Sequence, residues 1–268
     1  MTEPFRLHLP KSERCPIVAN LPHSGLLVPE AIAQTLNEPY QRYLPNQDWH
    51  LDKLYDFLPS LGITVLEALY SRYVVDLNRS AQEPFFGNFW QSAIPEKTAF
   101  NAPLYQISPS QDQLKHRLEQ FYHPYHKQLE QVLKQLLDHF DQVFLLDLHS
   151  FFGLIEDEIC LGNVNGQSCS EFLMSAVESE FASSGYQVVR NKVFSGGYIT
   201  RHYGQMPRVE ALQIEIRYPT YLASTQLDQS DVPDWNVPEF YHAQSNFEAI
   251  FRAIADRVNA IAHRRKLS

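Results

Sequence analysis

The 268-residue sequence has few cysteines and no long apolar segment. Its three cysteines, Cys15, Cys160 and Cys169, form no CxxC pair, which excludes a metal cage of cysteines alone and fits a reducing compartment. No apolar run approaches membrane-spanning length, and the N-terminal residues lack the apolar core of a secretory signal. We therefore expect a cytoplasmic protein without a membrane partner.

Basic charge is also scarce. The chain carries 22 Lys and Arg against 31 Asp and Glu, a formal net charge of −9, so a polyanion such as nucleic acid is not an expected partner. The sequence lacks the GxxxxGK[ST] phosphate loop, the full GxGxxG fingerprint and the GxSxG elbow. Nucleotide binding and serine-hydrolase chemistry are therefore poorly supported.

Strand-like and helix-like apolar patterns alternate along the chain. Strands are expected over residues 16–21, 62–66, 73–76, 142–147, 186–190 and 210–217. Helices are expected over residues 48–58, 110–140, 168–184 and 238–266, with an interruption near Pro124. This order predicts an α/β fold in which helices cover both faces of a mainly parallel sheet. Because there is no repeat or long linker, residues 1–268 are expected to form a single domain.

Two histidines follow apolar strands directly. His23 comes after strand 16–21 and His149 after strand 142–147, and ligands bind beyond the carboxyl ends of strands in sheets of this kind. Taken alone, each histidine is more simply a hydrogen-bonding loop residue. Asp147 is placed to orient the ring of His149, as carboxylates commonly do beside a metal. Two histidines and one carboxylate would suit a catalytic zinc site with a position open for water.

The carboxylate of such a site would come from the segment Asp48–Asp52. Asp48 and Asp52 are four residues apart, so both would lie on one face of the expected helix. The alternative is that Asp48 caps the helix and Asp52 forms an ordinary surface pair with Lys53. His50 lies on a different face and is expected to be structural.

Further polar residues near the strand ends are candidates for catalysis and substrate binding. The guanidinium fork of Arg79 suits a substrate carboxylate, and Asn78 adds an amide. Glu215 lies between two isoleucines, and burial there would raise its pKa and suit it as a general base. The glycine-rich segment 195–204 would bring Thr200 or Arg201 close to a small ligand. The alternatives are a turn with a salt bridge at Arg79, a solvated strand face at Glu215 and a surface loop at 195–204.

Six segments, taken in their order, resemble the motifs of the N-formylglutamate amidohydrolases. They are Pro22–Gly25, Asp48–Asp52, Arg72–Arg79, Asp147–Ser150, Gly196–Gly204 and Gln213–Glu215. The resemblance covers about residues 15 to 222 and implies kinship with zinc carboxypeptidases and aspartoacylases. It implies a zinc carboxypeptidase-like, three-layer α/β/α sandwich with a mainly parallel mixed sheet.

The same resemblance implies a reaction and roles for individual residues. The reaction is metal-dependent hydrolysis of N-formyl-L-glutamate to formate and L-glutamate, a step of histidine degradation. One divalent ion, zinc by preference, would be held by His23, His149 and Asp48, with Asp52 as the alternative carboxylate. Glu215 would be the general base, and Arg79 would neutralise the developing oxyanion. The implied substrate-binding residues are Arg72, Asn78, Arg79, Thr200 and Arg201.

Two segments depart from the pattern of this family, residues 80–89 and residues 151–157, and both are expected to border the substrate. The departures leave open a related N-acyl amino acid as substrate. They also leave open a carboxypeptidase-like or amidase activity on another small acidic amide or peptide. A catalytically silent binding protein is a third alternative, disfavoured because no candidate ligand or base is missing.

Overall fold

The computed structural model describes residues 3–227 and 229–266, and its centre is one seven-stranded sheet. In spatial order the strands are β1 (Phe5–His8), β3 (Thr64–Ala68), β2 (Ile17–Leu21), β6 (Val143–Phe151), β9 (Val209–Arg217), β7 (Ile159–Gly162) and β8 (Val188–Arg190). The four strands β3, β2, β6 and β9 run parallel to one another. β1 pairs antiparallel with β3, and β7 pairs antiparallel with β9. The expected mainly parallel mixed sheet is confirmed.

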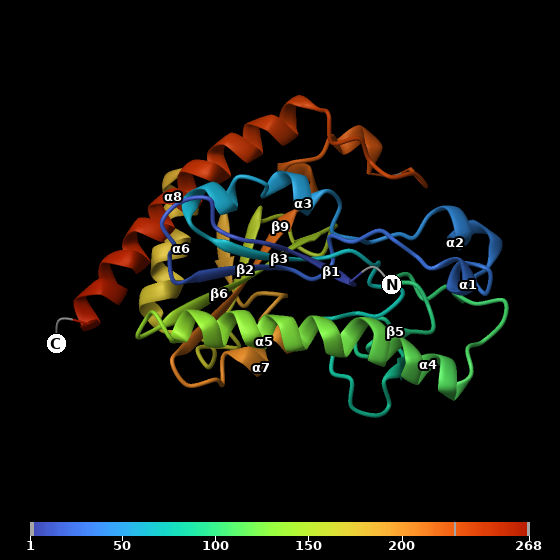
Figure 1. The fold of residues 1–268 in the computed structure, drawn as a ribbon. Coiled ribbons are helices and arrows are strands. Elements are labelled where there is room, and N and C mark those ends of the chain that lie inside the picture. The colour runs from blue at the N-terminus through green and yellow to red at the C-terminus, as the bar shows by residue number, and fades with distance from the viewer. Residues whose placement is uncertain (1–2, 228, 267–268) are drawn as a thin grey trace.

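Helices cover both faces of this sheet (Figure 1). One layer consists of α6 (Glu171–Ser183), the long α8 (Pro238–Lys266) and the short α3 (Leu51–Leu54). The opposite layer consists of α4 (Gln111–Arg117), α5 (His123–Leu137) and α7 (Tyr198–Tyr203). The remaining short elements are α1 (Glu30–Ala33), α2 (Glu38–Arg42), the two-stranded sheet of β4 (Phe86–Gly87) and β5 (Ile94–Pro95), and 3-10 turns at Leu58–Leu61, Tyr218–Thr220 and Ser224–Gln226. The three-layer α/β/α prediction is confirmed.

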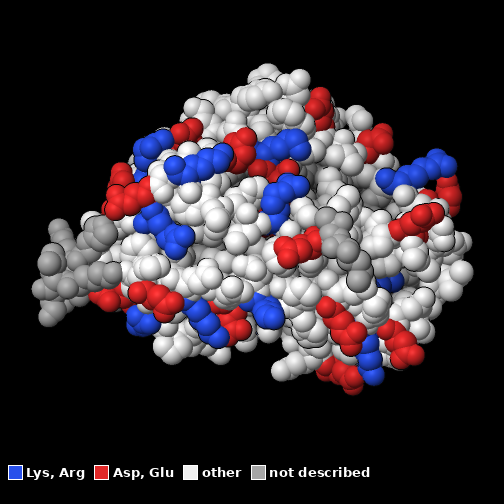
Figure 2. Space-filling view, in the orientation of Figure 1, with Lys and Arg blue, Asp and Glu red and all other residues white. Residues whose placement is uncertain are grey.

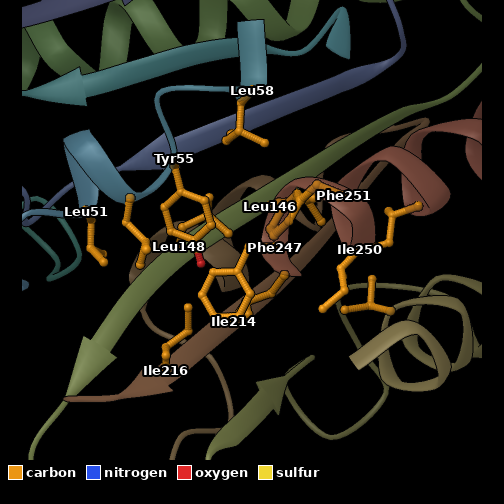
Figure 3. Packing of buried hydrophobic residues seen from close by; sticks show 14 of the residues in the cluster. Leu51, Tyr55, Leu58, Leu146, Leu148, Ile214, Ile216, Phe247, Ile250 and Phe251 are labelled. Carbon is orange, nitrogen blue, oxygen red and sulfur yellow. The ribbon is translucent and has the colours of Figure 1, made fainter. Parts of the chain in front are cut away.

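The sheet divides the apolar core in two, because successive side chains of a strand point to opposite faces. On β6, Phe144, Leu146 and Leu148 pack into the cluster that α6 and α8 cover, whereas Val143 and Leu145 belong to the cluster beneath α5. Figure 3 shows the first cluster, in which Leu146 and Leu148 of β6 and Ile214 and Ile216 of β9 lie near Phe247 and Phe251 of α8. Each fully buried large side chain stabilises the fold by about 1.5–3 kcal/mol.

The same alternation positions the polar residues of β6. Asp147 and His149 follow Val143 and Leu145 in the odd-numbered register, so they lie on the α5 side of the sheet. On this face the strand is apolar at its start and polar at its carboxyl end. The polar residues therefore gather where the parallel strands end.

Residues 73–76 form no strand, contrary to the prediction. Tyr73, Val74 and Val75 are all buried, but they lie in a turn in which the amide of Val74 donates to the carbonyl oxygen of Ser71 at 2.8 Å. A short, continuous apolar run indicates burial without deciding the backbone conformation. The segment delivers Asp76 and the residues that follow it from a loop instead of a strand end.

The predicted helix over residues 48–58 is also wrong in extent. Only Leu51–Leu54 is α-helical, and the preceding residue, His50, has φ of 56°, in the left-handed region that ends regular helix geometry. Leu51, Leu54 and Tyr55 are nevertheless buried, as the apolar spacing predicts. Asp48 lies before the helix, so it does not share a helical face with Asp52.

The interruption expected near Pro124 takes the form of a π-helical segment, Leu118–Tyr122, between α4 and α5. Pro124 then lies at the start of α5, directly after the π-helical segment, whose wider turn accommodates a residue that has no N–H to donate. The helical stretch therefore continues across the proline, with a wider turn in place of a break.

Charged side chains of both signs are interspersed on the face drawn in Figure 2, without a large area of one sign. Within the described residues, no helix combines the length and apolar character that crossing a membrane requires.

Candidate active site

His23, Asp48 and His149 converge at the carboxyl ends of β2 and β6. All three are buried, and one potential ligand atom from each lies within 4.8 Å of the others. The Oδ2 atom of Asp48 lies 3.0 Å from Nδ1 of His149 and 3.6 Å from Nδ1 of His23. Asp48 reaches the histidines because its segment is bent by two residues with positive φ, Asn46 and His50.

A buried carboxylate holds Nε2 of His23, the ring nitrogen that points away from Asp48. Its Nε2 lies 2.7 Å from Oδ1 of Asp76, and Asp76 also accepts a hydrogen bond from Nη2 of Arg72 at 2.7 Å. Although burial opposes its charge, the Arg72 guanidinium and His23 hold the pKa of Asp76 well below its usual value. A carboxylate there fixes the ring proton on Nε2 of His23 and turns the Nδ1 lone pair towards Asp48.

His149 has a corresponding partner in Asp147, as expected from the sequence. Nε2 of His149 lies 3.2 Å from Oδ1 of Asp147 and 3.0 Å from Nδ2 of Asn78. Asp147 also accepts hydrogen bonds from Nδ2 of Asn20 at 2.7 Å and from Oγ1 of Thr200 at 3.1 Å. Both histidines therefore present Nδ1 to one point and anchor Nε2 on a carboxylate.

Asp52 lies outside this group. Its side chain is partly exposed and forms an ion pair with the neighbouring Lys53, at 3.6 Å between Nζ and Oδ2. The helical-face argument that made Asp52 an alternative ligand fails, because the helix begins only after Asp48. His50 has a structural contact, with Nε2 2.7 Å from the carbonyl oxygen of Pro233.

The donor set fits a divalent metal ion such as zinc. Two imidazole nitrogens and one carboxylate oxygen are typical zinc ligands, and ligands about 2.0–2.1 Å from a tetrahedral ion lie about 3.3 Å apart. The separations of 3.0 and 3.6 Å from Asp48 to the two histidines bracket that value. Nδ1 of His23 is also buried without a hydrogen-bond partner among the described residues. Buried polar nitrogens are rarely left in this state, so the atom is suited to a ligand from outside the chain.

Glu215 lies beside this group on the neighbouring strand. β6 and β9 are parallel, and their register pairs His149 with Glu215, so the two side chains lie on the same face of the sheet. Nε2 of Gln213 donates to Oε1 of Glu215 at 2.8 Å. Burial raises the pKa of Glu215 to about 7. A carboxyl group with this pKa readily exchanges a proton near neutral pH.

A cavity of about 470 Å³ is lined by His23, Asp48, His149 and Glu215, together with Asn78 and Arg79. Arg79 donates from Nη1 to the carbonyl oxygen of Asn78 at 2.9 Å, while its Nε is buried without a partner among the described residues. Burial lowers the pKa of Arg79 below its usual value, and the nearby carboxylates of Asp76, Glu215 and Asp48 oppose that shift by favouring the charged form. Arg79 is therefore a partly buried cation whose Nε is free to donate a further hydrogen bond.

The other residues predicted to bind substrate lie in different surroundings. Arg72 lines the cavity, but it is bound to Asp76 and lies 3.8 Å from Oδ1 of Asp48. Asn78 also lines it, with Nδ2 3.3 Å from Asp147 and Oδ1 accepting from the amide of Ile199 at 2.8 Å. Thr200 is buried behind the cavity wall, where it donates to Asp147.

Arg201 is exposed and is not among the residues that line the cavity. The segment around it is the helix α7, in which Ile199, Thr200 and Tyr203 face the core. Helical periodicity therefore sends Arg201 to solvent. The loop geometry assumed for residues 195–204 applies only as far as Gly197.

Several supporting residues were not assigned a role from the sequence. Asp76 orients His23, and Asn20 holds Asp147; a signal for Asn20 was its polar side chain in an otherwise apolar strand. Gly197 is a third case, because a Cβ atom there would come within 2.3 Å of Nδ2 of Asn78. Its amide also donates to Oε1 of Gln213 at 2.6 Å, which connects the glycine loop to the partner of Glu215.

Known proteins share the sequence motifs and the fold of this chain. The sequence model of the N-formylglutamate amidohydrolase family matches residues 15–222. The chain belongs to this family. It is 36% identical to N-formylglutamate deformylase of Pseudomonas putida over 226 residues, which cover 80% of this chain and 84% of the relative. Identity to the N-formylglutamate deformylase of Pseudomonas aeruginosa is also 36%, over 79% of this chain and 84% of the relative.

Solved structures show the same relationship. The N-formylglutamate amidohydrolase from Ralstonia eutropha JMP134 superposes with a TM-score of 0.81 at 26% identity, covering 96% of this chain and 98% of that one. The Agrobacterium tumefaciens gene product Atu2144 has a TM-score of 0.71 at 15% identity, covering 96% and 95% of the two chains. The latter similarity shows a shared fold.

Proposed function

We propose that this member of the family hydrolyses N-formyl-L-glutamate to formate and L-glutamate, with one zinc ion held by His23, Asp48 and His149. The observation that carries the proposal is the convergence of the two Nδ1 atoms on Asp48, with each Nε2 anchored on a carboxylate. The activity named for the Pseudomonas relatives supports the choice of substrate.

A divalent ion bound at these residues would polarise the formyl carbonyl and lower the pKa of a water molecule. Asp76 and Asp147 keep the two histidines in the tautomer that such an ion requires. Arg72 supports the site from behind, because its guanidinium pairs with Asp76 and lies close to Asp48.

Glu215 is the proposed general base. Its carboxylate takes a proton from the attacking water, the water oxygen bonds to the formyl carbon, and the carbon–nitrogen bond breaks. The proton on Glu215 then passes to the leaving amine, so that one water molecule yields formate and the free amino acid. A pKa raised to about 7 by burial suits both transfers.

Arg79 is the proposed partner of substrate charge. It lines the cavity with an unpartnered Nε, and a guanidinium fork binds a carboxylate or a developing oxyanion through charge-assisted hydrogen bonds. Asn78 is proposed to hold other site residues in place and not to bind the substrate. Its side-chain amide already bonds to Asp147 and to the backbone amide of Ile199.

The test is hydrolysis by purified protein supplied with zinc. Incubation with N-formyl-L-glutamate should release formate and L-glutamate in equal amounts, and a chelator should abolish the release until zinc is restored. N-acetyl-L-glutamate is the matched comparison for the acyl group. Absence of formate release with zinc and with other divalent ions would overturn the proposed function.

A further inference from the structure

The cavity lining carries few cationic side chains. Among the described residues that line the cavity, two are arginines, Arg72 and Arg79, and none is a lysine. Arg72 is already bound to Asp76 at 2.7 Å and lies beside Asp48. Among the cations of the described lining, Arg79 keeps an unpartnered donor, so Arg79 is the cation that is available to the α-carboxylate of a substrate.

The outer part of the cavity is apolar. Trp90, Phe152, Leu154 and Val193 line it with 45%, 40%, 64% and 44% of their surfaces exposed. They are four of the twelve large hydrophobic side chains that are exposed within the described residues, and they come from three separate segments of the chain. Scattered exposed hydrophobics are normal, but convergence on one concave site indicates a ligand with an apolar group.

Trp90 belongs to the apolar wall that it forms with Phe152, Leu154 and Val193, and neighbouring contacts hold it in place. The ring of Trp90 lies edge-on to Phe89 at 5.0 Å between centroids, and Phe89 packs under the guanidinium of Arg72 at 4.6 Å. Leu154 has φ of 63°, a conformation that costs energy in a residue with a side chain and that recurs at binding sites. Trp90 is therefore held beside the proposed metal site through Phe89 and Arg72.

A large substrate side chain has room to extend. Asn46 and Phe152 line both this cavity and a neighbouring one of about 780 Å³. The ring of Phe152 lies 6.0 Å from that of Tyr218, which lines the second cavity. Aromatic side chains therefore line both cavities where the two adjoin.

We infer that the substrate side chain lies against Trp90, Phe152, Leu154 and Val193, and that N-formyl amino acids with one carboxylate and a large apolar side chain are substrates. The inference rests on the proposed function for the metal, the base and the hydrolysis. Arg79 binds the α-carboxylate. The apolar side chain of the substrate is transferred from water to the apolar surface of these four residues. The reaction is unchanged: water adds to the formyl carbon, the carbon–nitrogen bond breaks, and the amine takes the proton.

The experiment compares kcat/KM of the zinc-loaded protein for N-formyl derivatives of L-methionine, L-leucine, L-glutamate and glycine. N-formyl-L-methionine and N-formyl-L-leucine should exceed N-formylglycine at least tenfold, since burying a large apolar side chain adds about that much or more. Trp90→Ala and Phe152→Ala should each reduce the methionine-to-glycine ratio severalfold. Phe172→Ala removes a similarly exposed ring, 43%, that does not line the cavity, and should leave the ratio unchanged.

Phe152→Arg supplies a second cation and should shift the preference from N-formyl-L-methionine towards N-formyl-L-glutamate. If N-formyl-L-glutamate is hydrolysed while the apolar substrates are no better than N-formylglycine, the inference is wrong and the proposed function stands. If the apolar substrates turn over and N-formyl-L-glutamate does not, the inference stands and the proposed substrate is wrong. If none of the four releases formate, both are wrong.

Discussion

His149 and Glu215 are partners in the register of two parallel strands, β6 and β9, and lie on the same face of the sheet. The proposed metal ligand and the proposed base are thus fixed relative to each other by backbone hydrogen bonds. Sites built on strands are held more precisely than sites built on loops. The remaining members, His23, Asp48 and Arg79, reach this rigid pair from turns at the carboxyl ends of the strands.

Glu215→Gln should keep the metal and lose most activity. The amide has nearly the same shape and keeps the strand intact, but it takes no proton, so we expect kcat to fall by about 10²–10⁴-fold. Formate release and bound zinc should be measured on the same preparation. Glu210→Gln, on the same strand but bonded to Ser170, is the control. Activity of Glu215→Gln near that of Glu210→Gln would rule out the base assignment.

Asp48→Asn and Asp52→Asn should differ in metal content. Asp48 lies between the two histidines, whereas Asp52 pairs with Lys53 at the surface. We expect Asp48→Asn to weaken zinc binding at least tenfold, and Asp52→Asn to bind zinc like the wild type. Elemental analysis after dialysis against a series of chelator concentrations measures the difference. Equal zinc content in the two variants would contradict the proposed ligand set.

Asp76→Asn should weaken the metal site without removing a ligand. Asp76 receives the Nε2 proton of His23, and loss of such a partner typically costs about 10–100-fold in metal affinity. Competition with a zinc-binding dye reports the affinity. Asp112→Asn changes an exposed aspartate in the first turn of α4 and is the matched control. A zinc affinity equal to that of the control would show that Asp76 does not support His23.

Arg79→Ala should act on substrate binding and Arg201→Ala should not. Loss of a charge-assisted hydrogen bond costs about 1.5–3 kcal/mol, so we expect kcat/KM for N-formyl-L-glutamate to fall by roughly 10–150-fold. Arg201 is exposed outside the cavity, and its removal should leave kcat/KM within about twofold of the wild type. The opposite order of effects would restore Arg201 as the substrate-binding arginine.

The half-buried His126 should make the fold less stable in acid. Its Nε2 lies 3.0 Å from the carbonyl oxygen of Leu77, and burial lowers its pKa to about 3, below the value of about 6.5 in an unfolded chain. Below pH 6.5 the unfolded chain therefore takes up a proton that the folded protein does not. The contribution to stability is complete above pH 6.5 and is lost as the pH falls towards 3.

We expect His126→Gln to reduce the fall in the free energy of unfolding between pH 7 and pH 5 by about 1 kcal/mol, allowing for partial exposure of the ring. Urea denaturation at the two pH values measures it. The exposed His116→Gln variant is the control. A wild-type pH dependence in His126→Gln would contradict the prediction.

The segments that were predicted well have strong periodicity or length. β6, β9, α6 and α8 were all expected within a few residues of their observed bounds. β1 and β7 were missed, because each has only four residues, too few to show a periodic pattern. Residues 73–76 were predicted to be a strand because a buried turn and a buried strand both produce a short apolar run.

For the site, the sequence by itself determined which polar residues follow the parallel strands, and the order of its motifs determined the family. Only the tertiary structure brought Asp48, and not Asp52, beside the two histidines, because a left-handed His50 separates the two aspartates and no apolar periodicity encodes that bend. It also paired Asp76 with His23 and turned Arg201 to solvent. Those contacts join residues far apart in the chain, and they depend on how the loops cross the sheet edge, which local patterns do not specify.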